Sequence, residues 1–450
     1  MRIIERDKAF YKSMFAIALP ITLQNLITSS LNMIDTLMIT SLGEGSIAAV
    51  GLANQFFFFY ALIAFGINSG SSIFIAQFWG KKDTDNIKKV LGLAIILCGG
   101  VGVIFTAVAL FKPEYIMMFF TKEADVVRLG SDYLRIVSLS YIITGISFAF
   151  SVALRSIEQA KTPMVVSGIS FVTNTVFNYL LIFGKFGFPE LGIKGAAYGT
   201  LIARIVEIIF ILYAIYSDKG PLAGSLKELT NWNKEFVFKY FKTTYPVIVN
   251  ETFWSLGNVM YSVAYAKIGK EATAAVQIAN TIQNIFLVIS RGLANACTVM
   301  VGNKIGANEE KEAYSYAVKY LFIATTSGLF LGVILYLTSG FTLKAFNGLT
   351  DELFHTSKKM LAVMAIYLIA KMFNGTLIVG VLRGGGDTTF SMLLEMGSVW
   401  LVGVPLAFLG ALVFKLPVYY VMAIVSLEEV VKATIGLPRV ISKKWIRNVT

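Results

Sequence analysis

The sequence contains little charge for its length. Asp, Glu, Lys and Arg make up 15% of the 450 residues, whereas soluble domains carry about 25% charged residues. Hydrophobic residues account for 56% of the chain, and the mean hydropathy is +0.70. This composition excludes an ordinary soluble globular protein.

Cysteine and histidine are also scarce, which excludes several kinds of site. Cys98 and Cys297 both lie in apolar runs, so the chain has neither a disulfide framework nor the cysteine spacing of a zinc site. His355 is the only histidine, so a His-Glu-x-x-His metalloprotease site is absent. The chain also lacks a Gly-x-x-x-x-Gly-Lys-Ser/Thr phosphate loop and a Gly-x-Ser-x-Gly turn. We therefore expect no enzyme activity, no cofactor and no use of ATP.

Long apolar runs follow one another along the chain, separated by short polar breaks. A helical run of about 20 residues crosses a hydrocarbon layer about 30 Å thick. The sequence therefore predicts an all-α membrane protein with twelve transmembrane helices. The predicted spans are residues 14–40, 47–79, 88–111, 127–155, 163–186, 193–217, 238–267, 271–304, 313–340, 355–382, 389–413 and 417–438.

The excess of basic residues lies between these runs. The formal net charge is +12, and its basic residues gather at both termini and in the breaks near 80–89, 155–161, 218–242 and 304–319. The alternate breaks are short and carry few basic residues. Because basic loops stay on the cytoplasmic side of a membrane, we expect both termini in the cytoplasm. The expected partner is a lipid bilayer, not nucleic acid.

The first run could be mistaken for a signal peptide, because Arg2, Arg6 and Lys8 precede it. It stays apolar for too long, contains Asp35 and lacks a small-residue cleavage site, so we interpret it as a retained span.

The two halves of the sequence are related. A shift of 226 residues places Pro20 on Pro246 and Gly43 on Gly269, and it gives nine identities between positions 20 and 54 without a gap. Six spans per copy give both copies the same orientation, which predicts two lobes about a pseudo-two-fold axis along the membrane normal. The predicted domains are an N-terminal lobe of six helices (1–217), a cytoplasmic linker (218–237) and a C-terminal lobe of six helices (238–450).

Polar residues in the first half follow helical spacings, which place them on shared stripes. The three stripes are Gln24, Thr28, Asn32 and Asp35; Ser167, Ser170, Asn174 and Asn178; and Thr200, Arg204 and Glu207. The oxygens of Asp35, the two Asn amides and the Thr200 hydroxyl suit a small hard cation. A proton would need only the Asp35 carboxylate, and hydrogen bonding between helices is the alternative without a coupling role. Arg204 and Glu207 are predicted to form a local i,i+3 ion pair.

The second half carries a different set of polar residues. Its stripes are Glu251, Ser255, Asn258 and Ser262, beside Trp254, Tyr261 and Tyr265, and then Gln277, Asn284, Arg291, Asn295 and Thr298. Glu251 is predicted either to form a fixed ion pair with Arg291, or to bind a cationic substrate or second coupling ion with aromatic faces nearby. Lys371 and Glu395 have no assignable partners. The run at 382–388, Leu-Arg-Gly-Gly-Gly-Asp-Thr, is predicted to be a cytoplasmic turn.

Several motifs resemble one known family. They are Leu-Pro-Ile-Thr-Leu-Gln-Asn (19–25), Ile-Asp-Thr-Leu-Met-Ile-Thr-Ser-Leu-Gly (34–43), Ile-Ala-Ala-Val-Gly-Leu-Ala-Asn-Gln (47–55), Ile-Ala-Gln-Phe-Trp-Gly-Lys-Lys-Asp (75–83), Leu-Arg-Ser-Ile-Glu-Gln-Ala-Lys-Thr-Pro (154–163) and the run at 382–388. Together they resemble the bacterial, NorM- or DinF-like branches of the multidrug and toxin extrusion (MATE) transporters. The resemblance implies twelve helices in two lobes, alternating access driven by Na⁺ or H⁺, and export of varied, often cationic, compounds.

The resemblance also assigns residues. The family's N-lobe cation site falls on Asp35, Asn174, Asn178 and Thr200. Some members have an aspartate at position 178, where this chain is neutral. The acid of the first C-lobe helix resembles Glu251, whereas Met372 stands where NorM-type members carry an aspartate. The candidate substrate-binding residues are Glu251, Gln24, Asn32, Trp254, Tyr261, Asn284 and Arg291.

The leading hypothesis is a secondary antiporter of a bacterial inner membrane, which exchanges small organic molecules for Na⁺ or H⁺. One alternative is a lipid-linked saccharide flippase of the same broad superfamily, for which Arg291, Arg204 and Lys371 are the candidate diphosphate ligands. A membrane receptor or scaffold is a third possibility, but it leaves the acids on the polar stripes without a purpose.

Overall fold

The computed structural model describes residues 8–217, 219–344, 346 and 349–450. The basic residues Arg2 and Arg6 lie outside the described residues. The described residues form helices and no strand, which confirms the predicted all-α class. Ten helical segments in this part of the chain are long and apolar enough to cross a membrane.

The helices fall into two series. The first series is α1 (Lys8–Thr40), α2 (Glu44–Gly80), α3 (Thr84–Phe111), α4 (Pro113–Phe120), α5 (Ala124–Val137), α6 (Leu139–Ser156), α7 (Lys161–Phe183), α8 (Ile193–Ser217) and α9 (Leu226–Leu229). The second is α10 (Lys234–Ile268), α11 (Lys270–Gly306), α12 (Glu310–Lys344), α13 (Asp351–Gly375), η1 (Thr376–Arg383), α14 (Thr388–Ser398), η2 (Val399–Gly403), α15 (Val404–Phe408), η3 (Leu409–Val413), α16 (Val418–Val425) and α17 (Leu427–Ile441), where η marks a π-helix.

Two predicted spans are each interrupted by a turn residue. The span predicted at 127–155 breaks at Ser138, between α5 and α6, and the span at 417–438 breaks at Ser426, between α16 and α17. A break frees backbone carbonyls that need another donor inside a membrane. The Ser138 carbonyl accepts from the Tyr141 amide at 3.0 Å and also from the Thr106 hydroxyl at 2.7 Å. The 35-residue α10 is long enough to span but more polar than the ten segments counted above.

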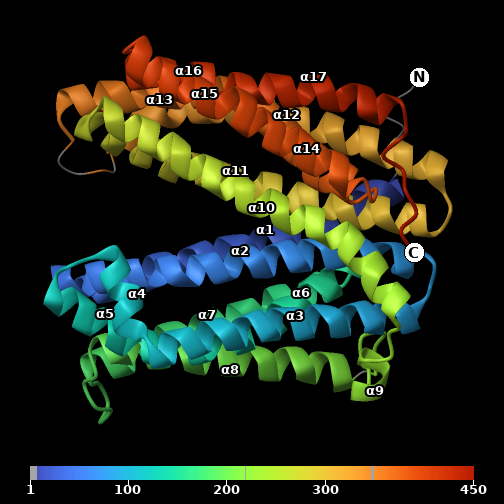
Figure 1. Ribbon diagram of the computed structural model, residues 1–450, viewed down its shortest axis with the longest axis horizontal. Coiled ribbons are helices and arrows are strands. Elements are labelled where there is room, and N and C mark those ends of the chain that lie inside the picture. The colour runs from blue at the N-terminus through green and yellow to red at the C-terminus, as the bar shows by residue number, and fades with distance from the viewer. Residues whose placement is uncertain (1–7, 218, 345, 347–348) are drawn as a thin grey trace. The chain divides into compact units, whose positions relative to one another are not determined.

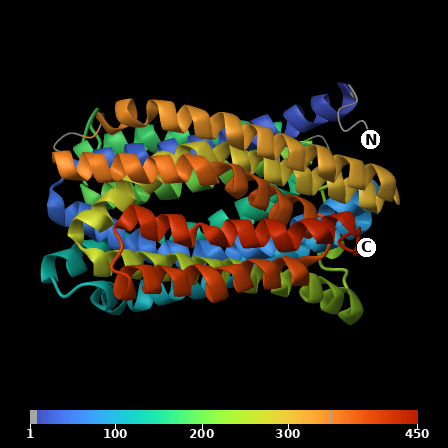
Figure 2. The same ribbon diagram turned by 90° about the horizontal axis from the view of Figure 1, so that it is seen from above.

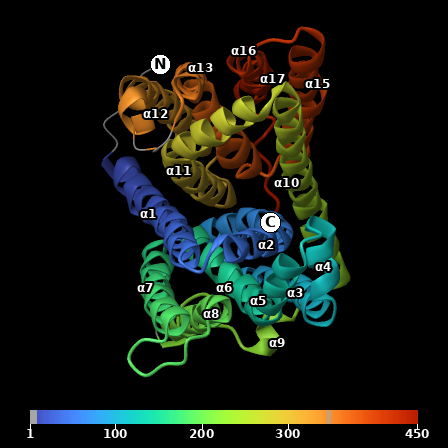
Figure 3. The same cartoon turned by 90° about the vertical axis from the view of Figure 1, so that its left-hand side faces the viewer.

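The chain forms two compact units. Unit 2 contains Leu19–Ile248, and unit 1 contains Val249–Thr450 with the described part of Met1–Ala18. In unit 2, α2, α3, α6 and α8 run side by side (Figure 1), and α5 lies against α2, α4 and α8 (Figure 3). In unit 1, α12 packs along α13 (Figure 2). The predicted lobes, which follow the halves of the sequence, stay a prediction.

The first segment of α1 and the first segment of α10 each pack in the unit formed by the other half of the sequence. Phe10 contacts the rings of Tyr316 and Tyr320 in unit 1, at centroid distances of 4.9 and 5.3 Å. In unit 2, Tyr240 stacks on Phe74 at 5.7 Å. The boundaries at Ala18 and Ile248 lie near Pro20 and Pro246, the prolines matched by the repeat.

The structure confirms the internal repeat over two pairs of helices. The helix starts of α2 and α11, and of α3 and α12, are 226 positions apart. Gly43 and Gly269 precede the first of these pairs with φ of 94° and 151°. Residues other than glycine rarely adopt such φ angles, which explains why glycine occupies both matched positions.

The linker between the sequence halves docks on α3 in unit 2. Ser225 caps the one-turn α9, and Lys88 Nζ forms a 2.7 Å ion pair with Glu228 Oε1. Hydrogen bonds from Lys88 and from Ser225 lower the pKa of Glu228 to about 2. Gly92 faces the backbone of Leu229, and an added Cβ would collide with its carbonyl. Glycine is therefore needed at position 92 for this close approach.

We expect Gly92→Ala to destabilise the protein by about 1–3 kcal/mol, the usual cost of overpacking. The matched control is Gly100→Ala on the same helix, where an added Cβ meets nothing within 4 Å. Because alanine favours helix over glycine, the control should be neutral or stabilising. Thermal unfolding of the purified protein measures both variants, and equal melting temperatures would contradict the predicted close packing.

Candidate functional site

The four residues predicted to bind a cation lie together in unit 2. Asn178 Nδ2 donates to Asp35 Oδ1 at 2.7 Å and to Asn174 Oδ1 at 3.1 Å. Asn174 Nδ2 donates to Thr200 Oγ1 at 3.3 Å. One chain of hydrogen bonds therefore joins α1, α7 and α8, and we call these four residues the Asp35 cluster.

The polar stripe of α7 explains how the cluster is positioned. Its four members each meet a polar partner on α1 or α8: Ser167 with Gln24, Ser170 with Glu207, Asn174 with Thr200, and Asn178 with Asp35. Close packing of α8 on α7 requires Gly199, because a Cβ at this position would collide with Asn178 Oδ1. The stripe faces protein, as its spacing predicted.

The electrostatics of the Asp35 cluster leave one acid without a fixed counter-ion. Asp35 is half-buried and forms no ion pair with any described residue. Arg204 acts on it at a distance, but its Nη1 pairs with Glu207 Oε2 at 2.6 Å, which confirms the predicted i,i+3 pair. Asn174 and Asn178 are each 1% exposed, and Asn178 Oδ1 lacks a hydrogen-bond donor.

This donor set fits a small hard cation. A carboxylate, amide oxygens and a hydroxyl are the ligands that such ions prefer. The buried Asn178 Oδ1 has lone pairs that no described residue satisfies, and a buried acceptor without a partner is costly. The same carboxylate also accepts a proton without further ligands.

The prediction that Arg291 pairs with Glu251 is wrong. Glu251 Oε1 pairs instead with Arg383 Nη1 at 2.6 Å, and Arg383 Nη2 lies 3.3 Å from Glu395 Oε2. Asn250 Nδ2 also donates to Glu395 Oε2, at 2.5 Å. Arg383 is the last residue of the π-helix η1 and is buried, whereas Arg291 on α11 is exposed. We call Asn250, Glu251, Arg383 and Glu395 the Arg383 network.

The run predicted to be a cytoplasmic turn at 382–388 does turn, but its charged side chains are buried. Arg383 is 2% exposed and Asp387 is 1% exposed. Asp387 accepts from Arg439 Nε at 2.7 Å and lies 3.1 Å from Arg447 Nη2. Gly385 gives room to Trp445, which is fully buried, and Gly386 gives room to the backbone of Arg447. The motif therefore anchors the C-terminal segment within unit 1.

The remaining predicted substrate-binding residues are dispersed. Trp254, Asn284, Arg291 and Asn32 are exposed on three different helices. Gln24 is 6% exposed and accepts from Arg155 Nη2 at 2.5 Å. Tyr261 donates to Glu428. These residues stay predictions as substrate contacts.

A charged cluster on α17 was missed by sequence reasoning. Lys432 Nζ lies 3.2 Å from Glu428 Oε1 and 3.5 Å from Glu429 Oε1, and all three residues are buried. Asn374 Nδ2 donates to Glu429 Oε2 at 2.7 Å. The i,i+3 and i,i+4 spacing of these charges within an apolar run was the available signal. Lys371, whose partner was unassigned, donates to Gln283 Oε1 at 3.2 Å.

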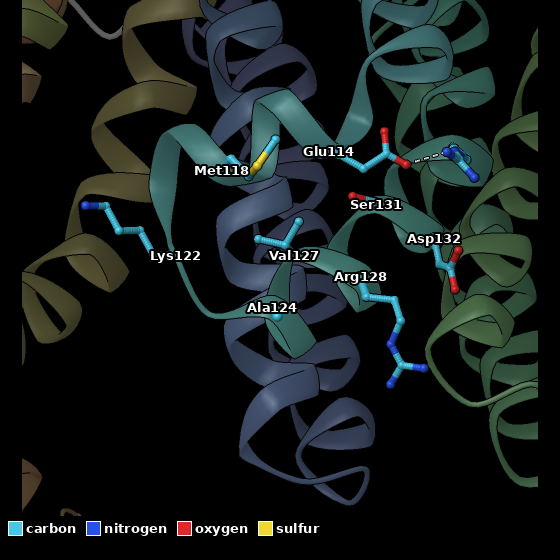
Figure 4. A pocket seen from close by; sticks show the side chains of 9 residues that line it. Glu114, Met118, Lys122, Ala124, Val127, Arg128, Ser131 and Asp132 are labelled. Carbon is cyan, nitrogen blue, oxygen red and sulfur yellow. Dashed lines mark hydrogen bonds and ion pairs between the residues drawn. The ribbon is translucent and has the colours of Figure 1, made fainter.

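A surface pocket of about 470 Å³ lies between α4 and α5, apart from every predicted site residue. Two of its lining residues, Glu114 and Arg135, form an ion pair at 2.5 Å, and Figure 4 shows Glu114 with the other labelled lining residues. The lining residues are Glu114, Met118, Lys122, Ala124, Val127, Arg128, Ser131, Asp132 and Arg135.

Known proteins resemble this chain over nearly its whole length. The sequence profile of the MatE family matches residues 20–180 and 246–409. A probable multidrug resistance protein NorM of Thermotoga maritima is 24% identical over 96% of this chain and 93% of its own length. The transporter YisQ of Bacillus subtilis is 26% identical over 90% of this chain and 88% of its own length.

Solved structures share the fold. An outward-facing multidrug resistance MATE family transporter of the MOP superfamily superposes with a TM-score of 0.87 at 20% identity, over 96% of both chains. A MOP superfamily transporter from Pyrococcus furiosus, described as having a binding pocket of reverse polarity, gives 0.86 at 20% identity, again over 96% of both chains. At these identities the likeness establishes the fold alone.

The Arg383 network yields a prediction about stability. We expect Arg383→Gln to cost about 3–5 kcal/mol, because it leaves buried carboxylates without their cation. Adding Glu251→Gln and Glu395→Gln to it removes the orphaned charges and should recover most of the loss. Thermal unfolding in detergent measures both variants. A triple variant as unstable as the single one would show that charge compensation is not the function of Arg383.

Proposed function

Because the chain belongs to the MatE family of multidrug efflux transporters, we propose that it exports small organic molecules in exchange for Na⁺ or H⁺. The chain is a multi-pass membrane protein. We place it in the inner membrane of a bacterium with both termini in the cytoplasm. The ion gradient supplies the energy, and neither ATP nor a cofactor takes part.

The Asp35 cluster carries this proposal. Its single carboxylate accepts from the neutral Asn178 amide, and no described basic residue is paired with it. An acid locked to an arginine, as Glu251 is, already has its charge compensated. Asp35 is free to exchange one monovalent cation for another, which is the property that a coupling residue needs.

The neutral Asn178 sets the charge of the bound state. With Asp35 as the one acid of the cluster, one bound Na⁺ or one proton gives a neutral site. Neutrality lowers the cost of carrying the site through a low-dielectric interior. One charge that moves inward through 100 mV releases about 2.3 kcal/mol, which supports roughly fiftyfold accumulation of substrate on the far side.

Alternating access connects ion and substrate. Binding of the cation to Asp35 from the outside favours the state that releases substrate, and loss of the cation to the cytoplasm resets the protein. The substrates that we propose are varied organic molecules, cations among them, because several relatives bear the name of multidrug resistance proteins. Glu251 contributes less attraction for a cation than predicted, because Arg383 shares its charge.

We expect Asp35→Asn to abolish dye transport in everted membrane vesicles while the protein still expresses and folds. The amide keeps the size of the side chain but carries no negative charge, so it neither compensates a bound cation nor takes up a proton. The matched control is Asp125→Asn, which removes an acid of unit 2 whose side chain is 89% exposed, and it should transport normally. Full transport by Asp35→Asn would refute the role of Asp35 in coupling.

The coupling ion is identified by dye efflux from an efflux-deficient host. We expect efflux to stop when the gradient of one ion is removed. Loss of efflux with a protonophore, together with indifference to Na⁺, identifies H⁺, whereas stimulation by a Na⁺ gradient that survives the protonophore identifies Na⁺. Efflux that persists without either gradient would contradict antiport.

A further inference from the structure

Arg155 and Arg383 occupy equivalent turns of the two sequence halves. The Glu158 amide donates to the Arg155 carbonyl at 3.0 Å, and the Gly386 amide to the Arg383 carbonyl at 2.8 Å. The next amide donates five residues back in both turns, from Gln159 to Leu154 and from Asp387 to Leu382. Every member of one turn is therefore 228 positions from its counterpart in the other.

The same correspondence extends to the partners of the two arginines. Ser167 stands 228 positions before Glu395, and Gln24 stands 226 positions before Asn250, as in the repeat of the first helices. Asn250 donates to Glu395 at 2.5 Å, and Gln24 Nε2 donates to Ser167 Oγ at 2.8 Å. The two networks share this hydrogen bond, but Arg155 bonds to Gln24 itself, whereas Arg383 bonds to Glu251 and Glu395.

The charges of the two networks differ. Arg383 is compensated by Glu251 and Glu395. Their counterparts are Asn25 and Ser167, which are neutral. Arg155 therefore bonds to the Gln24 amide oxygen at 2.5 Å and forms no ion pair with any described residue.

A guanidinium without a counter-ion is costly inside a membrane protein. Each arginine ends a helix, where the negative end of the helix dipole favours a cation. The helix dipole acts on both arginines, yet Arg383 is in addition paired with two carboxylates. The shorter Ser167 stands where its counterpart is a glutamate, and Ser167 and Arg155 both keep part of their surface exposed. An anionic ligand would compensate the charge of Arg155, and it can reach the guanidinium through this exposed surface.

We propose that Arg155, Gln24 and Ser167 bind an anionic oxygen group, a carboxylate or a phosphate, that replaces the missing glutamates. The planar guanidinium matches both groups with paired donors. Gln24 precedes Asp35 by 11 residues on α1, which is about 16 Å along a helix at 1.5 Å per residue. The anion subsite is thus separate from the Asp35 cluster. If the anionic group belongs to a transported molecule, a point that rests on the proposed function, the substrates include carboxylates and zwitterions.

The test compares two dyes that differ by one group. Rhodamine B carries a free carboxylate, and its ethyl ester does not. Fluorescence anisotropy with the full-length protein in neutral detergent measures the affinity of each dye. We expect rhodamine B to bind about tenfold to a hundredfold more tightly, the factor that one hydrogen bond between charged groups contributes.

Three variants assign this preference to the subsite. Arg155→Gln removes the charge, and Ser167→Glu supplies the carboxylate that the other network already has, so both should remove the preference for rhodamine B. Ser167→Gln adds the same bulk without charge, so it lowers the affinity for both dyes, but it leaves Arg155 uncompensated and the ratio of the two affinities should exceed that of Ser167→Glu. If Arg155→Gln fails to fold, the comparison of Ser167→Glu with Ser167→Gln still decides the result.

A second measurement identifies the source of the anion. If a lipid phosphate is the ligand, phosphatidylglycerol raises the melting temperature of the wild-type protein but not that of Ser167→Glu, and the dyes bind alike. Either outcome supports the subsite. A preference for rhodamine B that survives Arg155→Gln and Ser167→Glu overturns it, as does the absence of both the dye preference and the lipid effect. Transport of the ester that depends on Asp35 would leave the proposed function intact in that case.

Discussion

Charge buried among apolar helices has to be compensated, and the rest of the structure depends on how this is done. In unit 1 the described residues compensate one another: Arg383 lies between two glutamates, and Lys432 lies between two more. In unit 2, Asp35 and Arg155 each bond to an amide instead. A buried charge that is balanced by another side chain is fixed in place. A buried charge that no side chain balances can instead bind an ion or a charged ligand. The two units thus share a repeat but differ in these sites, although unit 2 also holds one internally compensated pair, Arg204 with Glu207.

The packing of α7 on α8 makes the second kind of compensation specific. One polar stripe on α7 holds Gln24 at one end and Asp35 at the other, both on α1. Gly199 lets α8 approach closely enough to keep Asn178 in place. In a site of this kind, the side chains that contact the ion must be held in one orientation. An amide that is free to turn would form hydrogen bonds with other protein groups and would lose its affinity for an ion.

Much of this arrangement could be predicted from the sequence, because it depends on local periodicity. The spacing of Asn174 and Asn178 placed both amides on one face, and the i,i+3 spacing of Arg204 and Glu207 gave their ion pair. The partner of Glu251 could not be predicted in this way. A π-helix changes the phase of every later residue, so the direction of Arg383 depends on a local geometry that its spacing does not encode. The hydrogen bond at the Ser138 break is likewise not encoded by local spacing, because its donor, Thr106, lies 32 residues away.

The exchange of helix segments between the units has a consequence for synthesis on the ribosome. Unit 2 needs the first segment of α10, so it is complete only after the chain has been made through Ile248, well past its own last long helix. Until then, the face of α2 that receives Tyr240 lacks its cover. Unit 1, in contrast, waits for Trp445 near the C-terminus, although its first contributor, the start of α1, emerges before almost everything else. Neither half of the sequence therefore completes its unit alone, and a chain truncated early leaves both units incomplete.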